Sequence, residues 1–537
     1  MVRAARSRAL AATLAVVAWS VAGRVHAATA DRPCPAPANP GAPVAIGTAE
    51  WNGWGRDDGN SRYQPEPALR ATDVPKLALR WAYALAPARA YSQPTVVGGR
   101  VFVASSNGWV YSLDARTGCT YWTFDAAAPI DTPIVIGALG KPVTLRPRWR
   151  RWHLQKAHIR VIEPPSAAIF GDAVGTVTAL DANRGTVLWR AALGARLHGA
   201  VSAAPVAADG RLYVPVASTA GGAGWVVALD PTSGAILWQS PPLVVHGASD
   251  AGTAAPTSPT IDSRRRALYV AIGDSGSLVA LNLADGTLRW VGQAPAEPIV
   301  PAPPDATRAK RAATRSARRK HAAASGVPAP PVASSQPPAV DPPILQSLAD
   351  GRQVLLTASA SGVVDAFDPD RGTLLWRTSV LPAAGGVEWS HAADHRKVYV
   401  AAARRVPQAG RDNAVIAAID IATGALRWRK AAPQPPCAAA RGCDPTRAHA
   451  VTVIPGILFC GSRDGHLRAY STIDGMAIWD FDAARVLPTV NDGLVRGGPL
   501  DRDGPTVVNG MAFVDAVDRA HGAPAAGLVL AFSVDAK

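Results

Sequence analysis

The chain has 537 residues, and its hydrophobic content of 48% and charged content of 18% exclude a disordered chain and provide ample material for a core. The 48 glycines and 47 prolines are typical of a turn-rich β protein. The formal net charge is +15, but the basic residues gather at the N-terminus and in stretches 141–160 and 305–321. We therefore expect basic loops on a nearly neutral scaffold, which argues against a general nucleic-acid-binding surface.

The N-terminus has the layout of a secretory signal peptide. Arg3, Arg6 and Arg8 precede an apolar run over residues 9–21, and small residues surround Ala27. We predict a signal peptide over 1–27, an extended segment over 28–50 and a periplasmic or secreted mature protein. The apolar run is short for a membrane span, and no later run is long enough, so no transmembrane segment is expected after cleavage.

A strand, turn, strand, turn, strand pattern recurs along the chain. In each copy a tryptophan follows a glycine by four residues, and an aspartate commonly precedes that glycine by four. The glycine permits a tight turn, the aspartate accepts bonds from turn amides, and the tryptophan is expected to fill the gap between neighbouring sheets. The seven tryptophans are Trp122, Trp189, Trp238, Trp290, Trp376, Trp428 and Trp479.

Repeats of about 50 residues with several strands each predict an all-β protein, a β-propeller. Residues 507–534 supply further strands that could pair with a strand near 77–84 and close the ring. We therefore predict a single eight-bladed propeller over 51–537, with a capping segment at 51–64.

Two long intervals between tryptophans indicate insertions. The first, 141–165, is basic and contains Trp149 and Trp152. The second, 294–343, is rich in Pro, Ala and Arg, and we expect it to be disordered. Either basic insertion could bind a polyanion or a protein partner.

The five cysteines fit an oxidising compartment. Cys437 and Cys443 could close one loop, and Cys34 and Cys119 could form a second disulfide. Cys460 lies in an expected strand and is interpreted as a buried free thiol.

Several motifs resemble the quinoprotein alcohol dehydrogenases, and most closely their polyvinyl-alcohol-dehydrogenase group. They are WNGWGRDDGNSRYQ (51–64), SLDARTGCTYW (112–122), GGVEWSHAAD (385–394) and the run 453–498 that ends in TVNDGLVRGG. The resemblance implies pyrroloquinoline quinone (PQQ) and Ca²⁺ in the central funnel, an aspartate that removes a proton, and a separate electron acceptor.

Other positions depart from what the resemblance implies. Residues 216–230 contain neither a vicinal cysteine pair nor a glutamate. Pro256 stands where a tryptophan floor is expected, and Asp131 and Ala360 replace basic residues. The segment expected to carry the catalytic aspartate is the second insertion, with Asp341 nearby.

The positions that match are the candidate cofactor-binding residues Gly386, Glu388, Trp389, Asn491 and Gly498, for which blade packing is the alternative role. No catalytic residue and no metal ligand is assigned. The first hypothesis is a propeller that binds a partner and has lost redox activity. The alternative is an active PQQ-dependent, polyvinyl-alcohol-type dehydrogenase with a rearranged pocket.

Overall fold

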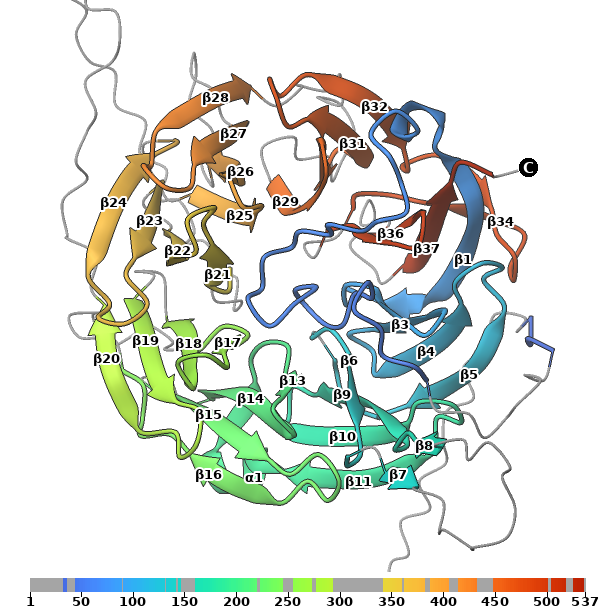
Figure 1. Cartoon of the computed structure of the whole chain (residues 1–537). Helices are drawn as coiled ribbons and strands as arrows, with labels where there is room; N and C mark the ends of the chain where they lie inside the picture. Colours follow the sequence, from blue (N-terminus) through green and yellow to red (C-terminus); the bar gives the residue numbers. More distant parts are fainter. Residues whose placement is uncertain are drawn as a thin grey trace, which may run out of the picture.

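The protein is a ring of eight antiparallel β-sheets, which confirms the predicted eight-bladed propeller (Figure 1). The computed structural model describes residues 32–35, 44–88, 90–130, 132–141, 143–145, 160–219, 223–244, 255–272, 277–292, 341–359, 362–381, 387–404, 414–431, 448–500, 504–517 and 525–535. In each blade the first strand lies nearest the axis and the tryptophan-bearing strand lies at the rim.

Blades 1 to 4 follow one another along the chain. Blade 1 comprises β2 (Thr95–Val97), β3 (Arg100–Ala104), β4 (Trp109–Asp114) and β5 (Thr120–Asp125). Blade 2 comprises β6 (Val135–Ala138), β9 (Ser166–Gly171), β10 (Thr176–Asp181) and β11 (Val187–Ala192). Blade 3 comprises β12 (Gly199–Val201), β13 (Val206–Ala208), β14 (Arg211–Ser218), β15 (Gly224–Leu229) and β16 (Ile236–Gln239). Blade 4 comprises β17 (Thr260–Asp262), β18 (Ala267–Ile272), β19 (Ser277–Asn282) and β20 (Leu288–Gly292).

Blades 5 to 7 repeat this order, and blade 8 joins the two chain ends. Blade 5 comprises β21 (Ile344–Ser347), β22 (Gln353–Ser359), β23 (Val363–Phe367) and β24 (Leu374–Ser379). Blade 6 comprises β25 (Val387–Ala393), β26 (Lys397–Arg404), β27 (Ala414–Asp420) and β28 (Leu426–Ala431). Blade 7 comprises β29 (Ala448–Ile454), β30 (Ile457–Ser462), β31 (His466–Ser471) and β32 (Ala477–Asp482). Blade 8 comprises β35 (Thr506–Val508), β36 (Met511–Val517), β37 (Ala525–Ser533) and, as its rim strand, β1 (Ala78–Ala88).

In the part of the chain that the structure describes, four short strands and two short helices lie outside the eight blades. The basic insertion begins and ends in the pair β7 (Val143–Leu145) and β8 (Arg160–Ile162), while most of the insertion lies outside the described residues. A second pair, β33 (Val486–Pro488) and β34 (Leu494–Arg496), precedes blade 8. The helices are η1 (Val74–Lys76) and α1 (Leu193–Leu197), and neither is long enough to cross a membrane.

At seven of the eight joints between blades, a rim tryptophan docks onto a glycine turn of the next blade. Gly286, for example, has φ +72°, and a Cβ atom there would lie 2.4 Å from the Trp238 ring. The indole N–H of Trp238 donates to the carbonyl of Leu283 in the same turn, at 3.2 Å. The same glycine contact recurs at six further joints, including Trp81 of the closing blade on Gly118. At the joint between blades 7 and 8, the indole N–H of Trp479 donates to the carbonyl of Leu77 at 3.0 Å instead. The expectation that tryptophan fills the gap between sheets is thus confirmed, and the glycine is required both for its backbone conformation and for its bare surface.

The aspartates of the repeat also have the predicted structural role. Oδ1 of Asp114 accepts the backbone N–H groups of Arg116 (3.1 Å) and Thr117 (2.8 Å). Asp368 makes equivalent bonds in blade 5. These bonds hold the turn in the shape that presents its glycine to the tryptophan.

Near the axis, hydrogen bonds from side chains join the first strand of one blade to the next blade. Thr260 Oγ1 donates to the carbonyl of Pro343, and Thr506 Oγ1 donates to that of Pro94 (2.8 Å). Ser390 Oγ accepts the N–H of Val451 at 2.8 Å. Further joints use Thr95 to Ile134, Ser202 to Pro256, Gln346 to Ala393 and Thr452 to Pro505. The ring is therefore bonded at both its rim and its axis.

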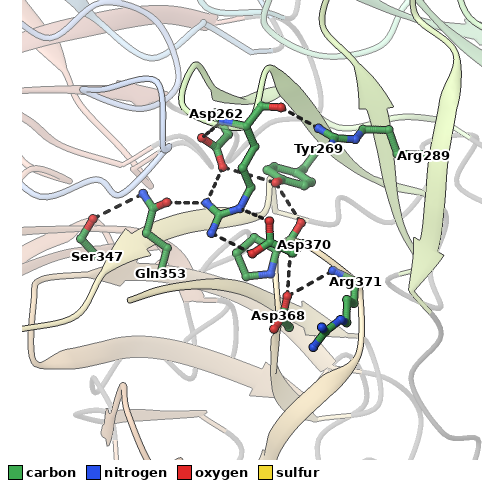
Figure 2. Close-up of polar contacts among 10 residues, drawn as sticks. Asp262, Tyr269, Arg289, Ser347, Gln353, Asp368, Asp370 and Arg371 are labelled. Carbon is green, nitrogen blue, oxygen red and sulfur yellow. Dashed lines mark hydrogen bonds and ion pairs between the residues drawn. The ribbon is translucent and has the colours of Figure 1, made fainter. Parts of the chain in front are cut away.

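Blades 4 and 5 carry an additional polar clamp across the point where residues 293–340 are inserted. Arg265 of blade 4 binds Asp370 of blade 5 through Nε (2.8 Å) and Nη2 (3.1 Å), and it also binds Asp262 and Gln353. Figure 2 shows these contacts, with the Tyr269 hydroxyl donating to the carbonyl of Pro369. Burial opposes the charge of Arg265, but its hydrogen bonds to Asp370 and Asp262 raise its pKa overall. The clamp keeps these two blades in register despite the long insertion.

The predicted disulfide between Cys34 and Cys119 is confirmed, and it ties the N-terminal segment to blade 1. Cys460 is a buried free thiol, as predicted. Cys437 and Cys443 lie outside the described residues, so the second pairing stays a prediction.

The docking contact can be separated from backbone strain with two alanine variants. Gly286 and Gly210 have nearly the same φ, +72° and +71°, but a Cβ at Gly210 would meet nothing within 4 Å. We expect Gly210→Ala to lower the free energy of unfolding by about 1–2 kcal/mol, and Gly286→Ala to lower it clearly further. In a Trp238→Ala background the tryptophan ring is absent. The loss of unfolding free energy caused by Gly286→Ala should then fall to that caused by Gly210→Ala. Denaturant unfolding of the mature chain measures all four variants, and equal costs in both backgrounds would contradict the docking explanation.

Candidate functional site

The segment 51–64, called the plug below, crosses the axis of the ring and bonds to the inner strands (Figure 1). Ser61 accepts the N–H of Ala393 at 2.9 Å, and Gly59 accepts that of Leu345 at 2.9 Å. Further bonds join Trp51 to Val96, Asn52 to Ile136, Asp58 to Ile261, Arg62 to Val453 and Gln64 to Val507. The plug thus bonds to seven blades at once, as expected of a capping segment.

Arg62 holds the plug from within. It is 1% exposed, and its guanidinium donates to the carbonyls of Val451 (2.8 Å) and Trp54 (2.7 Å) and to Gln93 Oε1 (2.8 Å). The guanidinium also lies 4.8 Å from the ring centre of Trp54. A buried charge is tolerated only when its donors are satisfied, and the planar fork of arginine reaches several acceptors at once.

Lysine at position 62 would keep the positive charge but would lose the planar guanidinium group that donates to several acceptors. We expect Arg62→Lys to lower the free energy of unfolding by about 3 kcal/mol, because several buried acceptors lose their donor. The matched control is Arg70→Lys, since the Arg70 side chain is 83% exposed. Thermal unfolding measures the stability of both variants. Equal losses of stability would contradict the view that the buried hydrogen bonds of Arg62 stabilise the plug.

The plug lies at the face formed by the turns between the first and second strands of the blades. Tyr63 packs edge-on against His395 in the turn of blade 6, at 5.8 Å between ring centres. Asp58 lies toward the corresponding turn of blade 3, and partial desolvation together with the charges of Asp57 and Asp209 raises the pKa of Asp58 to about 6.

The raised pKa of Asp58 predicts that the free energy of unfolding depends on pH. Because its folded-state pKa lies above its unfolded value, its ionisation costs stability above about pH 6, and the cost disappears as the pH falls toward 4. We expect Asp58→Asn to unfold at a higher temperature than the parent at pH 7.5 and at the same temperature near pH 4. Asp492→Asn, which replaces an exposed carboxylate elsewhere, is the control. A difference that is independent of pH would contradict the assignment.

One carboxylate lies at the axis-facing edge of the ring directly beyond the plug. The N–H groups of His391 and Ala393 both point from β25 toward the axis, because they alternate with those that pair with β26. Ala393 is bonded to the plug, and the N–H of His391 donates to Asp341 Oδ2 at 3.0 Å. The side chain of Asp341 is 9% exposed. Asp341 therefore occupies the first position on this edge that the plug leaves free.

The imidazole of His391 stands beside the same carboxylate. Nδ1 lies 3.3 Å from Asp341 Oδ2, and the His391 side chain is 1% exposed. Among the described residues neither ring nitrogen has a hydrogen-bond partner. These two neighbouring side chains are called the Asp341–His391 dyad below.

The predicted cofactor residues are distributed over distant places. Gly386 and the side chains of Glu388 and Trp389 lie outside the described residues, although the backbone of the last two belongs to β25. The side-chain amide of Asn491 binds both backbone groups of Ala84 on the rim strand β1, at 2.8 and 2.9 Å.

Gly498 is buried, and its carbonyl packs beside Gly465. For Asn491 and Gly498 the contacts are therefore those of blade packing, which was the alternative role. A cofactor role for these five residues stays a prediction.

The sequence analysis noted Asp341 but did not select His391. The pattern around His391 was a weak indication, because SHAAD is only a histidine among small residues in an expected strand. Asp341 precedes the two prolines before β21, at the end of a low-complexity stretch. Only the packing of blade 5 against blade 6 brings the two together.

The described residues fit part of the PQQ–Ca²⁺ site that the resemblance implies. Asp341 supplies an axis-facing carboxylate oxygen, which suits a proton acceptor or a ligand for a hard cation. Among the described residues there is no group of three or more His, Cys, Asp or Glu side chains that could hold a metal. Asp341 is therefore the described residue that could hold such a cation or accept a proton.

Comparisons with known proteins place the chain in a family. The family model described as "Outer membrane protein assembly factor BamB" matches residues 148–324 and 360–522, and the model "Glucose/ethanol/alcohol dehydrogenase, beta-propeller domain" matches residues 51–135. The polyvinylalcohol dehydrogenase of Pseudomonas sp. is 32% identical over 92% of this chain and 79% of its own length. That of Sphingopyxis sp. is 31% identical over 92% and 78%.

Solved structures support the fold. The quinohemoprotein alcohol dehydrogenase from Comamonas testosteroni superposes with a TM-score of 0.60 at 17% identity, covering 92% of this chain and 82% of that one. BamB from Moraxella catarrhalis superposes with a TM-score of 0.50 at 17% identity, covering 85% and 99%. With a closed eight-bladed ring and a match over 92% of its length to two polyvinylalcohol dehydrogenases, the chain belongs to the family of PQQ-dependent quinoprotein alcohol dehydrogenases.

Proposed function

We propose that this protein is an exported quinoprotein-type dehydrogenase that oxidises hydroxyl groups of the kind found in polyvinyl alcohol. The observation that carries the proposal is the Asp341 carboxylate at the axis-facing edge of β25, next to the plug, in a chain related over 92% of its length to two polyvinylalcohol dehydrogenases. This reverses the order of the two hypotheses drawn from the sequence, because the relationship extends over nearly the whole chain.

The chain's own residues would perform the acid–base part of the reaction. PQQ, when bound, supplies a quinone that accepts hydride. Asp341 would accept the hydroxyl proton of the substrate, and the plug would keep solvent from entering through the opposite end of the channel. Arg62 and the interblade bonds would keep the inner strands, and therefore Asp341, in a fixed position.

Export and electron transfer follow from the same proposal. The Cys34–Cys119 disulfide is compatible with an oxidising compartment, and the N-terminal 27 residues have the pattern of a signal peptide. A separate acceptor would reoxidise the reduced cofactor.

A second candidate function is a binding propeller without redox activity. It is favoured by the departures from the family pattern in blade 3, where β14, β15 and the described residues between them contain neither the expected cysteine pair nor a glutamate. In that case the basic insertions 141–165 and 294–343 would be the first places to look for a polyanion or protein partner.

Titration of the purified mature chain with PQQ and Ca²⁺ separates the two candidates. We expect saturable changes in quinone absorbance, followed by dye reduction with secondary alcohols and with polyvinyl alcohol. Asp341→Asn should retain quinone binding and lose turnover by about 10²-fold or more, because the proton acceptor is gone. The control Asp365→Asn removes a buried carboxylate that pairs with Arg377 instead. Quinone binding that is absent in the parent protein would favour the non-redox binder.

A further inference from the structure

The turn between the third and fourth strands of a blade, called the outer turn below, receives the rim tryptophan of the preceding blade. At three joints a basic side chain of the preceding blade binds the same turn. Arg211 of blade 3 donates to the carbonyls of Leu283 (2.9 Å) and Ala284 (2.8 Å) in blade 4. Lys397 of blade 6 donates to the carbonyl of Thr472 in blade 7 at 2.7 Å. The polar clamp between blades 4 and 5 is the third case.

The carbonyl that receives the basic side chain is left open at the joint between blades 5 and 6. The carbonyl of Leu283 accepts both the indole N–H of Trp238 at 3.2 Å and the guanidinium of Arg211. The equivalent carbonyl in blade 6 belongs to Ile421, and it accepts the indole N–H of Trp376 at 3.0 Å. Among the described residues no second donor reaches this oxygen.

Blade 5 does not supply that donor because its polar side chains bind elsewhere. Arg352 Nε donates to Asp350 Oδ2 at 2.7 Å. Gln353 accepts a hydrogen bond from Arg265 of the clamp and donates to Ser347 at 3.4 Å (Figure 2). The place that a basic side chain fills at three other joints is therefore a pocket here, with a volume of about 410 Å³.

This pocket, called the blade 5–6 pocket below, opens to solvent on the face where the plug lies. Its volume is within the range of small-molecule sites, about 300–1,000 Å³. The apolar part of its lining comes from Leu348, Ala349, Ile421 and Ala422. Leu348 and Ile421 are buried, so a ligand in the pocket would contact apolar side chains that belong to the core.

The carboxylates that line the pocket are already paired with arginines. Asp350 binds Arg352, and Asp420 Oδ2 binds Arg427 at 2.6 Å. The ammonium group of Lys397 is bonded to blade 7, as described above. These groups therefore give the pocket little net charge of their own.

Arg396 and Ile421 lie together in the pocket and offer a donor and an acceptor. The carbonyl of Arg396 accepts the N–H of Ile421 at 3.0 Å, while the guanidinium of Arg396 has no hydrogen-bond or ion-pair partner among the described residues. A cation at the Ile421 carbonyl would be repelled by this guanidinium, and an anion has no hydrogen to donate to the carbonyl. Hydroxyl groups both donate and accept, and an aliphatic chain between them suits the apolar lining.

We propose that the blade 5–6 pocket is a second binding site for a hydroxyl-bearing polymer chain, apart from the axis of the ring. The proposal rests on the proposed function, which gives the protein such a substrate. A polymer held in this pocket would have a higher local concentration of its remaining hydroxyl groups at the axis. Because the two places are separate, this advantage requires a chain that is long enough to occupy both.

Binding can be measured by calorimetric titration of the mature chain with polyvinyl alcohol in the absence of cofactor. We expect Ala422→Phe to fill the pocket and to lower the affinity about 10-fold or more. The matched control is Ala284→Phe, which changes the same place in the outer turn of blade 4, where Arg211 occupies the space. Ala349→Phe fills the pocket from the side of blade 5 and should act like Ala422→Phe. Circular dichroism and thermal unfolding establish that the variants are folded.

The class of ligand is tested through Arg396. We expect Arg396→Gln to lower the affinity for polyvinyl alcohol about 3-fold or more, because one donor is weakened. Arg264→Gln, which replaces an exposed arginine in the turn between the first two strands of blade 4, should leave the affinity unchanged. No binding by the parent, equal affinity in the parent and both phenylalanine variants, or tighter binding of polyacrylate than of polyvinyl alcohol overturns the proposal.

The kinetic arm uses the protein reconstituted with PQQ and Ca²⁺. We expect Ala422→Phe to raise KM for long polyvinyl alcohol about 3-fold or more and to leave kcat unchanged. Both constants for isopropanol should stay as in the parent, because this small alcohol does not need the pocket. A parent-like KM for the polymer overturns the role of the pocket in turnover. Lack of turnover by the parent overturns the proposed function, and the calorimetric arm then decides separately whether the pocket binds the polymer.

Discussion

The docking of one tryptophan ring on a bare glycine turn, repeated from blade to blade, is the contact on which this structure depends. The indole fills the wedge between two twisted sheets, and its N–H is bonded to the neighbouring turn. A methyl group on the glycine would clash with the ring, so this close approach of the two blades requires glycine at the turn. Because the same contact closes blade 8 on blade 1 through Trp81 and Gly118, each sheet packs between two neighbouring blades.

The candidate site is a consequence of that closure. Eight inner strands converge on the axis, and the plug bonds to seven of them. Arg62 makes the plug rigid from its buried position, while the hydroxyl-to-carbonyl bonds between blades prevent the inner strands from sliding. The Asp341–His391 dyad therefore stands on a rigid frame. Its members come from different blades and approach each other only because blades 5 and 6 are held in register.

The comparison with related proteins sharpens the chemical question. Two polyvinylalcohol dehydrogenases match 92% of this chain, while blade 3 lacks residues that the family pattern implies. The Asp341 carboxylate agrees with the family relationship as far as proton transfer is concerned, because accepting a proton needs only one positioned base. A calcium site needs six to eight oxygen ligands. The two halves of the chemistry can thus be tested separately, the first through the dyad and the second through metal and quinone binding.

The sequence by itself determined the architecture, because the glycine, aspartate and tryptophan spacing encodes local turns and a local wedge that need no long-range information. It also indicated the Cys34–Cys119 pair as one possible disulfide and correctly placed Cys460 in a buried strand. Pattern matching offered Asn491 and Gly498 as site residues, but their described contacts are with β1 and the Gly465 turn. The position of Asp341 beside His391, 50 residues apart in the chain, was decided by the tertiary structure alone. Contacts across a blade interface depend on how two sheets pack. The residue pattern within either strand does not encode the distance between side chains on different blades.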